Sequence, residues 1–309
     1  MINLVAGGAG FIGHHLCKRL LAQGHKIVCI DNLSTGTSAN LELLKDDNFK
    51  SIYHDITEPL HMIGHVDRIY NLACPASPID YQLDPVKTMM TNVVGTKNLL
   101  DLAVQNNASF LQASTSEVYG DPHVDIQRES YFGNVNTCGP RACYDEGKRA
   151  AETLVYEYGK HGVKVHIARI FNTYGPDMRE DDGRVIPNFI MQALKDFPVT
   201  IYGNGKQTRS LCYVDDTVTA LIRLMDNEYK FPVNVGKNSE ISIAELADLI
   251  ISLTMSKSKL TFEYLPIDDP RKRCPDVSLA KSLLGFEASI ELIEGLGKTI
   301  NYFVDRIKR

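Results

Sequence analysis

The sequence predicts an α/β fold, with a doubly wound parallel sheet and a smaller C-terminal α+β domain. Three observations lead to this prediction. Apolar runs of strand length alternate with amphipathic helical stretches through the first two-thirds of the chain, which is the pattern of βαβ units. A glycine-rich turn separates the first apolar run from the first helical stretch. After about residue 176 the alternation gives way to charged loops and shorter elements.

Length and charge limit the classes of protein to consider. The chain has 309 residues, which at roughly 100–200 residues per domain leaves room for about two domains. Lysine and arginine number 33 against 38 aspartates and glutamates, a formal charge of −5. This mild acidic balance lacks the basic footprint of nucleic-acid-binding proteins. No apolar run approaches the length of a membrane span. We therefore expect neither a nucleic acid nor a membrane as a partner.

The N-terminus and the cysteines indicate the cellular compartment. The chain runs directly into the glycine turn, without the basic, apolar and cleavage regions of a signal peptide. Its seven cysteines, at positions 17, 29, 74, 138, 143, 212 and 274, show no CxxC pair or metal-ligand spacing. Scattered thiols of this kind are typical of a reducing compartment. We expect a cytoplasmic protein that holds no structural disulfide or metal ion.

The elements of the predicted sheet follow in order along the chain. A strand at 2–6 leads through the glycine turn into a helix at 11–23, and a second strand at 26–30 ends at Asp31. Connections between parallel strands cross over right-handed, so helices are expected on the faces of the sheet. The remaining strands are predicted at 51–54, 68–72, 110–114 and 163–169, and two long helices at 84–105 and 144–160.

The last third of the chain is predicted to divide between the two domains. A charged loop at 179–183 and a strand with a glycine turn at 201–205 belong to the smaller domain. A helix at 242–253 carries Ser242 and Glu245 at the spacing of a capping box. A helix at 214–225 and a strand at 233–235 indicate a return to the sheet. The predicted boundaries are 1–175, joined by 210–236, for the first domain, and 176–209 with 237–309 for the second.

The glycine turn predicts a dinucleotide site of the Rossmann type. Gly7, Gly10 and Gly13 would let backbone N–H groups approach a pyrophosphate at the N-terminus of a helix. Asp31, about 20 residues further along, would accept hydrogen bonds from both ribose hydroxyls and repel a 2′-phosphate, which favours NAD over NADP. Glycines also serve plain turns, but here strand, spacing, helix and acid all fit. The other cofactor residues predicted around them are Phe11, Ile12, Asn32, Ser34, Thr35, Gly36, Asp55, Ile56, Leu72 and Ala73.

Two further groups of residues point to proton and hydride transfer. Tyr144 and Lys148 are four residues apart in a predicted helix and share one face. A phenol is a poor base at neutral pH, but a neighbouring ammonium and NAD⁺ would lower its pKa, so the pair could remove a hydroxyl proton. Most such pairs are ordinary surface pairs. Thr115, Ser116 and Glu117 follow an apolar strand, at the edge where parallel sheets bind ligands. Their alternative role is capping of the next turn.

Four segments carry a family resemblance. These are GGAGFIG from residue 7, STSEVYG from 114, the Tyr144-x-x-x-Lys148 pair and RIFNTYGP from 169. Together they resemble the extended short-chain dehydrogenase/reductase family that acts on nucleotide sugars, over nearly the whole chain. Within that family, LACPASP from 72, GPRACYDEGKR from 139 and DDPRKRCPD from 268 resemble the UDP-glucuronate decarboxylases.

The resemblance implies a Rossmann domain with tightly held NAD and a C-terminal domain that grips UDP-glucuronate. It implies decarboxylation to UDP-xylose through a 4-keto intermediate, and a homodimer formed through the helices at 84–105 and 144–160. Thr115, Tyr144 and Lys148 would form the redox triad, while Ser116 and Glu117 would act at the reacting end of the sugar. Release of the 4-keto pentose with free NADH stays open as an alternative outcome.

The resemblance also implies a set of substrate contacts. Arg273 would face the sugar carboxylate; the alternative is a solvated basic turn with Arg271 and Lys272. The other residues expected to contact the substrate are Pro75, Tyr81, Lys87, Arg141, Asn172, Arg184, Tyr202 and Arg209. Asn172 and Arg209 are expected at the diphosphate, Arg209 because a guanidinium suits phosphate.

Three other functions remain open at this point. A nucleotide-sugar 4,6-dehydratase of the same fold carries an Asp before the Glu, where this chain has Ser116, whose hydroxyl is a poor proton donor. A 4-epimerase of the same fold needs no residue like Glu117. A non-catalytic NAD-binding sensor commonly lacks the tyrosine or lysine of the triad, and both are present here.

Overall fold

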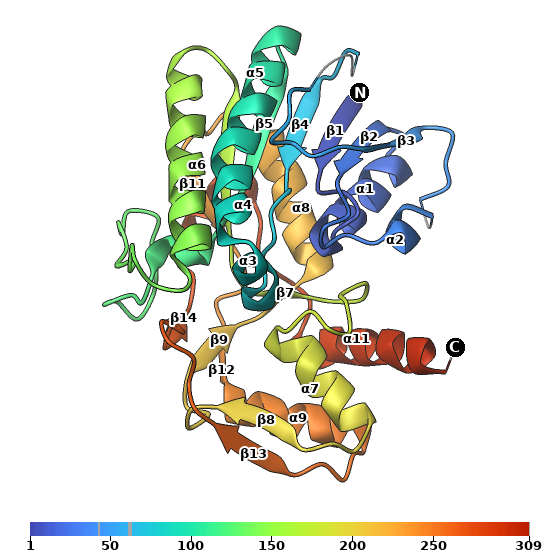
Figure 1. Cartoon of the computed structure of the whole chain (residues 1–309), viewed down its shortest axis with the longest axis vertical. Helices are drawn as coiled ribbons and strands as arrows, with labels where there is room; N and C mark the ends of the chain where they lie inside the picture. Colours follow the sequence, from blue (N-terminus) through green and yellow to red (C-terminus); the bar gives the residue numbers. More distant parts are fainter. Residues whose placement is uncertain (43, 61–63, 309) are drawn as a thin grey trace.

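The computed structural model describes residues 1–42, 44–60 and 64–308. A parallel sheet with helices on both faces forms the larger part, and a smaller lobe of helices and short strands lies beyond one end of the sheet (Figure 1). This is the doubly wound α/β architecture that the sequence predicts.

The larger part is organised by a seven-stranded sheet whose paired strands all run parallel. The strand order is β11-β6-β5-β4-β1-β2-β3, so the order reverses beside β1 and leaves a crevice at the carboxyl ends of β1 and β4. The strands are β1 (Ile2–Ala6), β2 (Lys26–Asp31), β3 (Phe49–Tyr53), β4 (Arg68–Asn71), β5 (Ser109–Thr115), β6 (Val165–Ile170) and β11 (Pro232–Val235). Because β11 pairs with β6, the chain returns to the sheet after its first excursion into the smaller lobe.

Two groups of helices cover the sheet. Helices α1 (Phe11–Ala22) and α8 (Val214–Met225) pack on one face, and α5 (Thr96–Asn106) and α6 (Ala142–Lys160) on the other. The single helix predicted at 84–105 is α4 (Pro85–Met90), a wider π-helical turn η1 (Thr91–Gly95) and α5 in succession. The short helices are α2 (Ser38–Glu42), α3 (Pro78–Leu83), η2 (Ser116–Tyr119) and α10 (Ser278–Leu284).

The smaller lobe is built from segments that lie far apart in the sequence. Its helices are α7 (Val185–Leu194), α9 (Ile243–Thr254) and α11 (Leu292–Ile307), and the predicted capping box of α9 is confirmed by reciprocal bonds between Ser242 and Glu245. Strand β8 (Val199–Tyr202) pairs with β13 (Leu260–Glu263), and β9 (Thr208–Ser210) lies between β12 (Glu240–Ser242) and β14 (Lys272–Arg273). Strands β7 (Thr173–Tyr174) and β10 (Cys212–Tyr213) pair where the chain leaves and re-enters the larger part.

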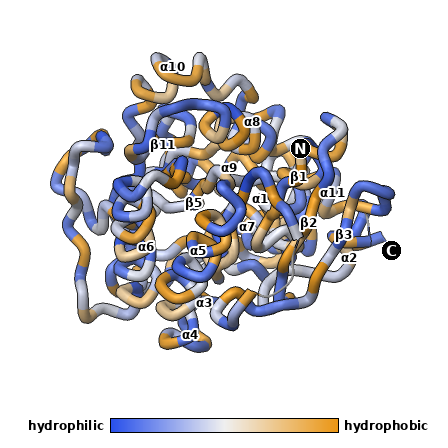
Figure 2. Tube along the Cα trace, turned by 90° about the horizontal axis from the view of Figure 1, so that it is seen from above, coloured by the Kyte–Doolittle hydropathy of each residue, from blue (hydrophilic) through white to orange (hydrophobic). Residues whose placement is uncertain are grey.

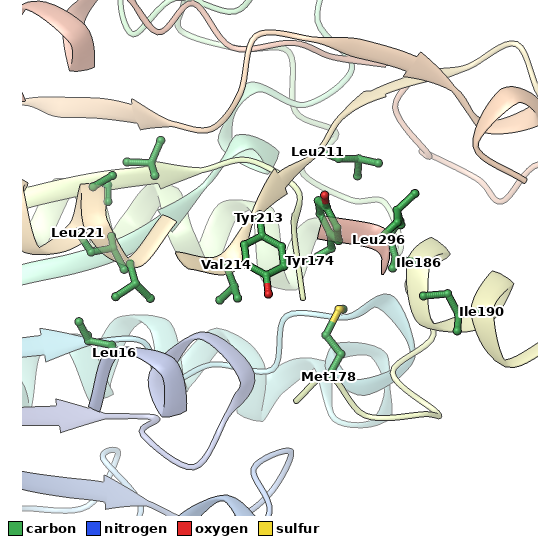
Figure 3. Packing of buried hydrophobic residues seen from close by; sticks show 14 of the residues in the cluster. Leu16, Tyr174, Met178, Ile186, Ile190, Leu211, Tyr213, Val214, Leu221 and Leu296 are labelled. Carbon is green, nitrogen blue, oxygen red and sulfur yellow. The ribbon is translucent and has the colours of Figure 1, made fainter. Parts of the chain in front are cut away.

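One hydrophobic core joins the two parts. The cluster that contains Val5 of β1 and Leu221 of α8 continues without a break to Ile186 of α7 and Leu246 of α9. Figure 3 shows Tyr213 between Leu221 and Ile186, so an aromatic side chain fills the junction. Hydrophobic stretches also reach the periphery at α4 and α10 (Figure 2). Across the described part of the chain, none of the helices combines the length and the apolar character needed to cross a membrane.

Candidate active site

A cleft of about 750 Å³ lies between the carboxyl ends of the sheet strands and the smaller lobe. Of the residues predicted from the sequence for catalysis, cofactor and substrate, all but two line it. The exceptions are Gly36 and Arg273. The structure therefore brings segments from the whole length of the chain to one cavity, large enough for a dinucleotide portion and a sugar nucleotide portion side by side.

The glycine turn has room only for glycine at its critical positions. Gly7 has φ +81°, and a Cβ there would lie 2.8 Å from the backbone nitrogen of Ala73. A Cβ on Gly13 would lie 2.1 Å from the carbonyl oxygen of Gly7. Gly7 therefore lets the turn approach the segment after β4, and Gly13 lets α1 pack on the turn. Together they leave an open backbone cradle of the kind that holds a pyrophosphate.

Asp31 lies beside this cradle, as the prediction requires. Its carboxylate accepts hydrogen bonds from the backbone N–H groups of Ala9, at 2.9 Å, and Leu33, at 2.8 Å. Burial raises the pKa of Asp31, and these two hydrogen bonds act against that shift. Gly36 does not reach the cleft; it packs against this arrangement, because a Cβ there would lie 2.8 Å from the Cβ of Ala9 and 3.0 Å from the Asp31 carboxylate. Its predicted cofactor contact is therefore indirect in this structure.

A polar network closes the far end of the cofactor cradle. Asp55 accepts hydrogen bonds from Asn32, at 3.0 Å, and Thr57, and its carboxylate lies 2.8 Å from the ammonium of Lys87. Although burial opposes ionisation, these partners hold the pKa of Asp55 well below its usual range. The sequence placed Lys87 among the substrate residues. The structure places it instead at Asp55, on the side predicted for the adenine of the cofactor.

Tyr144 and Lys148 line the centre of the cleft from one face of α6, and both are buried. The Lys148 ammonium lies 5.8 Å from the centre of the Tyr144 ring and donates a hydrogen bond to the carbonyl of Ala113 at 2.9 Å. Burial and the neighbouring Cys74 raise the pKa of Tyr144, while the Thr115 hydroxyl lowers it. Burial also lowers the pKa of Lys148. The expectation that Lys148 brings the pKa of the phenol down is thus not met by these residues alone.

Thr115 and Glu117 lie where β5 ends. The Thr115 hydroxyl accepts a hydrogen bond from the backbone N–H of Glu117 at 3.2 Å, so it caps the turn η2 as well as facing the phenol of Tyr144. The two roles weighed from the sequence are therefore compatible, since a hydroxyl oxygen accepts one bond while its proton remains free for another.

The opposite end of the cleft holds three arginines and two carboxylates, here called the Arg–carboxylate cluster. Glu117 accepts a hydrogen bond from Arg141 at 2.6 Å and two from Arg273, at 3.0 and 3.2 Å. Asp269 lies 2.9 Å from Arg209 and 3.7 Å from Arg141. Burial opposes ionisation of Glu117, yet Arg273 and Arg141 hold its pKa well below the usual range. The cluster keeps one positive charge in excess, which suits an anionic ligand.

Arg273 has a different place from the one predicted. Its side chain is only 1% exposed, and it lies behind Glu117 instead of lining the cleft. Strand β14 explains this position, because Arg273 is the register partner of Arg209 on the parallel strand β9. The alternative of a solvated basic turn is wrong for Arg273, although Arg271 and Lys272 are exposed, with Lys272 paired to Asp125.

The other predicted substrate residues line the cleft between these two ends. Arg184 forms a bidentate pair with Asp182 and lies 5.9 Å from the centre of the Phe11 ring. Tyr202 is 47% exposed at the end of β8, on the rim. Pro75 and Asn172 contribute to the wall.

The sequence reasoning missed three residues at this site. Asp269 holds two arginines, Cys74 lies against Tyr144 and Lys148, and Asp145 is buried beside Tyr144 with one carboxylate oxygen that has no hydrogen-bond partner among the described residues. Asp269 and Asp145 stand inside the segments DDPRKRCPD and GPRACYDEGKR, so their position beside named candidates was a usable signal. Burial and Glu117 raise the pKa of Asp145 to about 8.

A doubly wound sheet with a glycine cradle, an acid at the end of β2 and a buried Tyr–Lys pair defines an NAD-dependent enzyme of the Rossmann type. Residues 3–236 match the model of the NAD dependent epimerase/dehydratase family. The chain belongs to this family, which confirms the resemblance to extended short-chain dehydrogenases/reductases, and NAD is its cofactor.

Two kinds of relatives are similar to the chain. UDP-glucuronic acid decarboxylase 1 of Danio rerio is 51% identical over 302 residues, covering 97% of this chain and 72% of that protein. UDP-glucuronic acid decarboxylase 6 of Arabidopsis thaliana is 51% identical over 296 residues, covering 95% of this chain and 86% of that protein. Among solved structures, UDP-glucose 4-epimerase of Thermotoga maritima, with UDP-glucose, has a TM-score of 0.93 at 27% identity, covering 99% and 100%. UDP-glucuronic acid 4-epimerase of Bacillus cereus, with UDP-glucuronic acid and NAD, has a TM-score of 0.89 at 27% identity and the same coverage.

Proposed function

We propose that the protein decarboxylates UDP-glucuronate to UDP-xylose, through a 4-keto intermediate, with NAD as a bound cofactor. The observation that carries this proposal is a sequence identity of 51%, over 95% or more of this chain, to UDP-glucuronic acid decarboxylases of Danio rerio and Arabidopsis thaliana. The Arg–carboxylate cluster supports it, because the substrate brings a carboxylate and a diphosphate to a site with excess positive charge.

The two ligands would divide the cleft between them. NAD would bind in residues 1–175 and 210–236, with its pyrophosphate at Gly7, Gly10 and Gly13 and a ribose at Asp31. When bound, NAD⁺ accepts a hydride and later returns it, and it adds a positive charge beside the phenol of Tyr144. UDP-glucuronate would lie against residues 176–209 and 237–309, with its phosphates toward Asn172 and Arg209.

Oxidation at C4 would use the residues at the centre of the cleft. Tyr144 takes the proton of the C4 hydroxyl as the C4 hydride leaves, and Thr115 holds the reacting oxygen by a hydrogen bond. With the cofactor bound, the charge of NAD⁺ would add to that of Lys148 in stabilising the phenolate form of Tyr144. The Tyr144 proton returns to the C4 oxygen when the hydride returns, so Tyr144 ends the cycle in its starting protonation state.

Decarboxylation would take place at the Arg–carboxylate cluster. After oxidation, the C5 carboxylate is β to a ketone, so the C5–carboxyl bond breaks, CO₂ leaves and its electron pair enters an enolate. A proton that comes from solvent then adds to C5, so the reaction as a whole takes up one proton as CO₂ leaves. Arg141, which lines the cleft, and Arg273, which fixes Glu117, would orient the carboxylate, and Ser116 and Glu117 would lie at the carbon that is protonated.

Product analysis tests the proposal directly. The purified protein is incubated with UDP-glucuronate, and the products are followed by mass spectrometry. Loss of CO₂ with retention of the UDP group and NAD unchanged is the expected result. Loss of CO₂ with one NADH formed per product would show release of the 4-keto pentose instead. A sugar nucleotide that is never changed would overturn the proposal in favour of an NAD-binding sensor.

A 4-epimerase is the second candidate, because a solved structure of similar fold acts on UDP-glucuronic acid according to its name. The same experiment separates the two, since epimerisation changes no mass but gives an isomer with a different chromatographic retention. A 4,6-dehydratase would lose water instead, and Ser116 in place of an acid disfavours it.

We also propose a cytoplasmic homodimer. The scattered cysteines support the location. The exposed side of α4, next to α6, supports the dimer, because Val86 is 71% exposed and Met90 42% exposed there. Burying such side chains against a second copy removes apolar surface from water. Sedimentation analysis tests this proposal, and a Val86→Glu variant should shift the protein toward monomer.

A further inference from the structure

We propose that Tyr81 is a positioning residue for Tyr144, whose ring it holds by stacking. The inference rests on the proposed role of Tyr144 as the base. The two rings are nearly parallel, with interplanar angle 7° and centroids 5.1 Å apart. Both side chains are buried, Tyr81 with 1% exposure. One face of the reacting phenol is thus covered by another aromatic ring.

Tyr81 is itself held from several elements. It lies on α3, whose first turn is capped by Ser77, and its carbonyl accepts hydrogen bonds from Thr88 of α4, at 3.1 Å, and from Cys143 of α6, at 3.7 Å. The neighbouring Asp80 is paired with Arg179 at 3.1 Å. The backbone that carries the stacking ring is therefore held to α4, to α6 and, through Asp80, to the loop before α7.

The stack restricts the movements that would misplace the phenol oxygen. That oxygen lies at the far end of the Tyr144 side chain. Rotation about the Cα–Cβ bond displaces the oxygen, and rotation about the Cβ–Cγ bond turns the plane of the ring. A parallel ring in contact opposes both movements, and stacked aromatic pairs are favourable beyond the area they bury. A displacement of about 1 Å at a reacting atom can cost about 10²-fold in rate. Tyr81 would therefore act on turnover through Tyr144.

The ring of Tyr81 also lies 6.0 Å from the guanidinium carbon of Arg141, which binds Glu117. Tyr81 thus connects the base to the Arg–carboxylate cluster. A direct contact between the Tyr81 hydroxyl and the substrate is the competing role. That hydroxyl is buried and has no hydrogen-bond partner among the residues that the structure describes. The ring and the hydroxyl can be separated by substitution.

Two variants separate these roles: Tyr81→Phe keeps the stack and removes the hydroxyl, and Tyr81→Leu removes the stack. The reduction of bound NAD is followed by absorbance in a single turnover with UDP-glucuronate, and UDP affinity is measured by calorimetry. We expect Tyr81→Leu to slow the reduction of bound NAD about 10- to 100-fold. Its KM for UDP-glucuronate and its affinity for UDP should stay within about threefold of the wild-type values. Tyr81→Phe should lose no more than about threefold. Tyr81→Met, of similar volume but without a ring face, should behave like Tyr81→Leu and replaces it if that variant fails to fold.

Two results would overturn the inference. A rate of reduction in both Leu and Met variants equal to that of the wild type would mean that the stack has no positioning role. A Phe variant as slow as the Leu variant, or a rise in KM that accounts for the loss, would make Tyr81 a substrate contact. Hydride transfer to NAD is common to decarboxylation and 4-epimerisation, so this test stands even if product analysis shows an epimerase.

Discussion

The two ends of the cleft are built on different principles. At the cofactor end, the backbone of a short segment, Gly7 to Gly13, forms the cradle, and one acid from the next strand completes it. At the substrate end, side chains form the site. Five charged groups come from η2, the start of α6, β9, β14 and the loop before β14, and each depends on a partner from another segment.

This difference predicts different sensitivities. A backbone cradle is damaged by added volume, because a Cβ on Gly13 would meet the Gly7 carbonyl at 2.1 Å. A cluster of buried charges is damaged by removal of a partner, because the remaining charge stays in a place with little water. Removing one partner of a buried ion pair typically destabilises a protein more than replacing both partners with apolar residues does.

The largest effect is expected where the two ends meet, at Tyr144. Tyr144→Phe keeps the ring and removes the phenol, and loss of a general base typically lowers turnover by about 10²–10⁴-fold. The variant should keep the amount of bound NAD, the affinity for UDP and the melting temperature of the wild type. That result would show that both ends of the cleft form without the phenol of Tyr144. Turnover near that of the wild type would mean that another residue takes the proton.

Arg273→Ala tests the substrate end. It leaves Glu117 with one of its two guanidiniums, and the loss of a buried charged partner costs about 3–5 kcal/mol. We expect a large fall in melting temperature and a raised KM for UDP-glucuronate, with UDP affinity little changed. Arg271→Ala is the matched control, since Arg271 is exposed and two residues away.

Two outcomes of this comparison would revise the picture of the substrate end. Equal loss of UDP and UDP-glucuronate affinity in Arg273→Ala would place this arginine at the diphosphate. Stability and kinetics matching those of Arg271→Ala would mean that the Arg–carboxylate cluster tolerates an unpaired charge.

Asp31→Asn tests the cofactor end, with a smaller expected effect. The variant removes the negative charge that would repel a 2′-phosphate and keeps an acceptor for only one of the two backbone N–H groups that bond to Asp31. The preference for NAD over NADP should fall about tenfold, or about 1.4 kcal/mol. Fluorescence titration with both reduced cofactors measures the change. If wild-type protein is purified with NADP bound, the assignment of Asp31 is wrong.

At Asp145 the expected effect appears as a pH dependence of stability. Burial and Glu117 raise its pKa to about 8, so the folded protein holds a proton there that the unfolded chain releases above about pH 4. The stabilisation that this group contributes is therefore full below about pH 4, and it is lost as the pH rises through about 8. Asp145→Asn cannot ionise, so its melting temperature should exceed that of the wild type at pH 8 and differ less at pH 5. The same difference in melting temperature at pH 5 and pH 8 would contradict the raised pKa of Asp145.

The local geometry predicted from the sequence is confirmed where it depends on neighbouring residues alone. Gly7 and Gly13 are recognisable because a tight turn and close helix packing exclude any side chain. Tyr144 and Lys148 share a face because a helix brings residues four apart together. The fold class followed from the alternation of apolar runs with amphipathic stretches, which needs no knowledge of distant contacts.

Two placements that differ from the expected ones involve pairings between distant segments. Lys87 was expected to contact the substrate or the cofactor, and it lies at Asp55, on the side predicted for the adenine, because α4 packs next to the end of β3. Arg273 was placed at the surface of the substrate site, yet a strand of two residues draws it behind Glu117. A strand this short has no periodicity to detect.

The substrate residues of the cleft were expected from the family resemblance. By itself, the sequence determined the doubly wound α/β fold, the glycine cradle of the cofactor and the Tyr144–Lys148 pair. Each of these follows from short-range rules: the period of apolar residues, the size of glycine and the spacing along one helix. Tertiary structure alone decided which charges neutralise one another, which guanidinium stays open to the cleft and which ring covers Tyr144. The reason is physical: the energy of a buried charge or a stacked ring depends on its spatial neighbours, and those are set by the register of strands far apart in the chain.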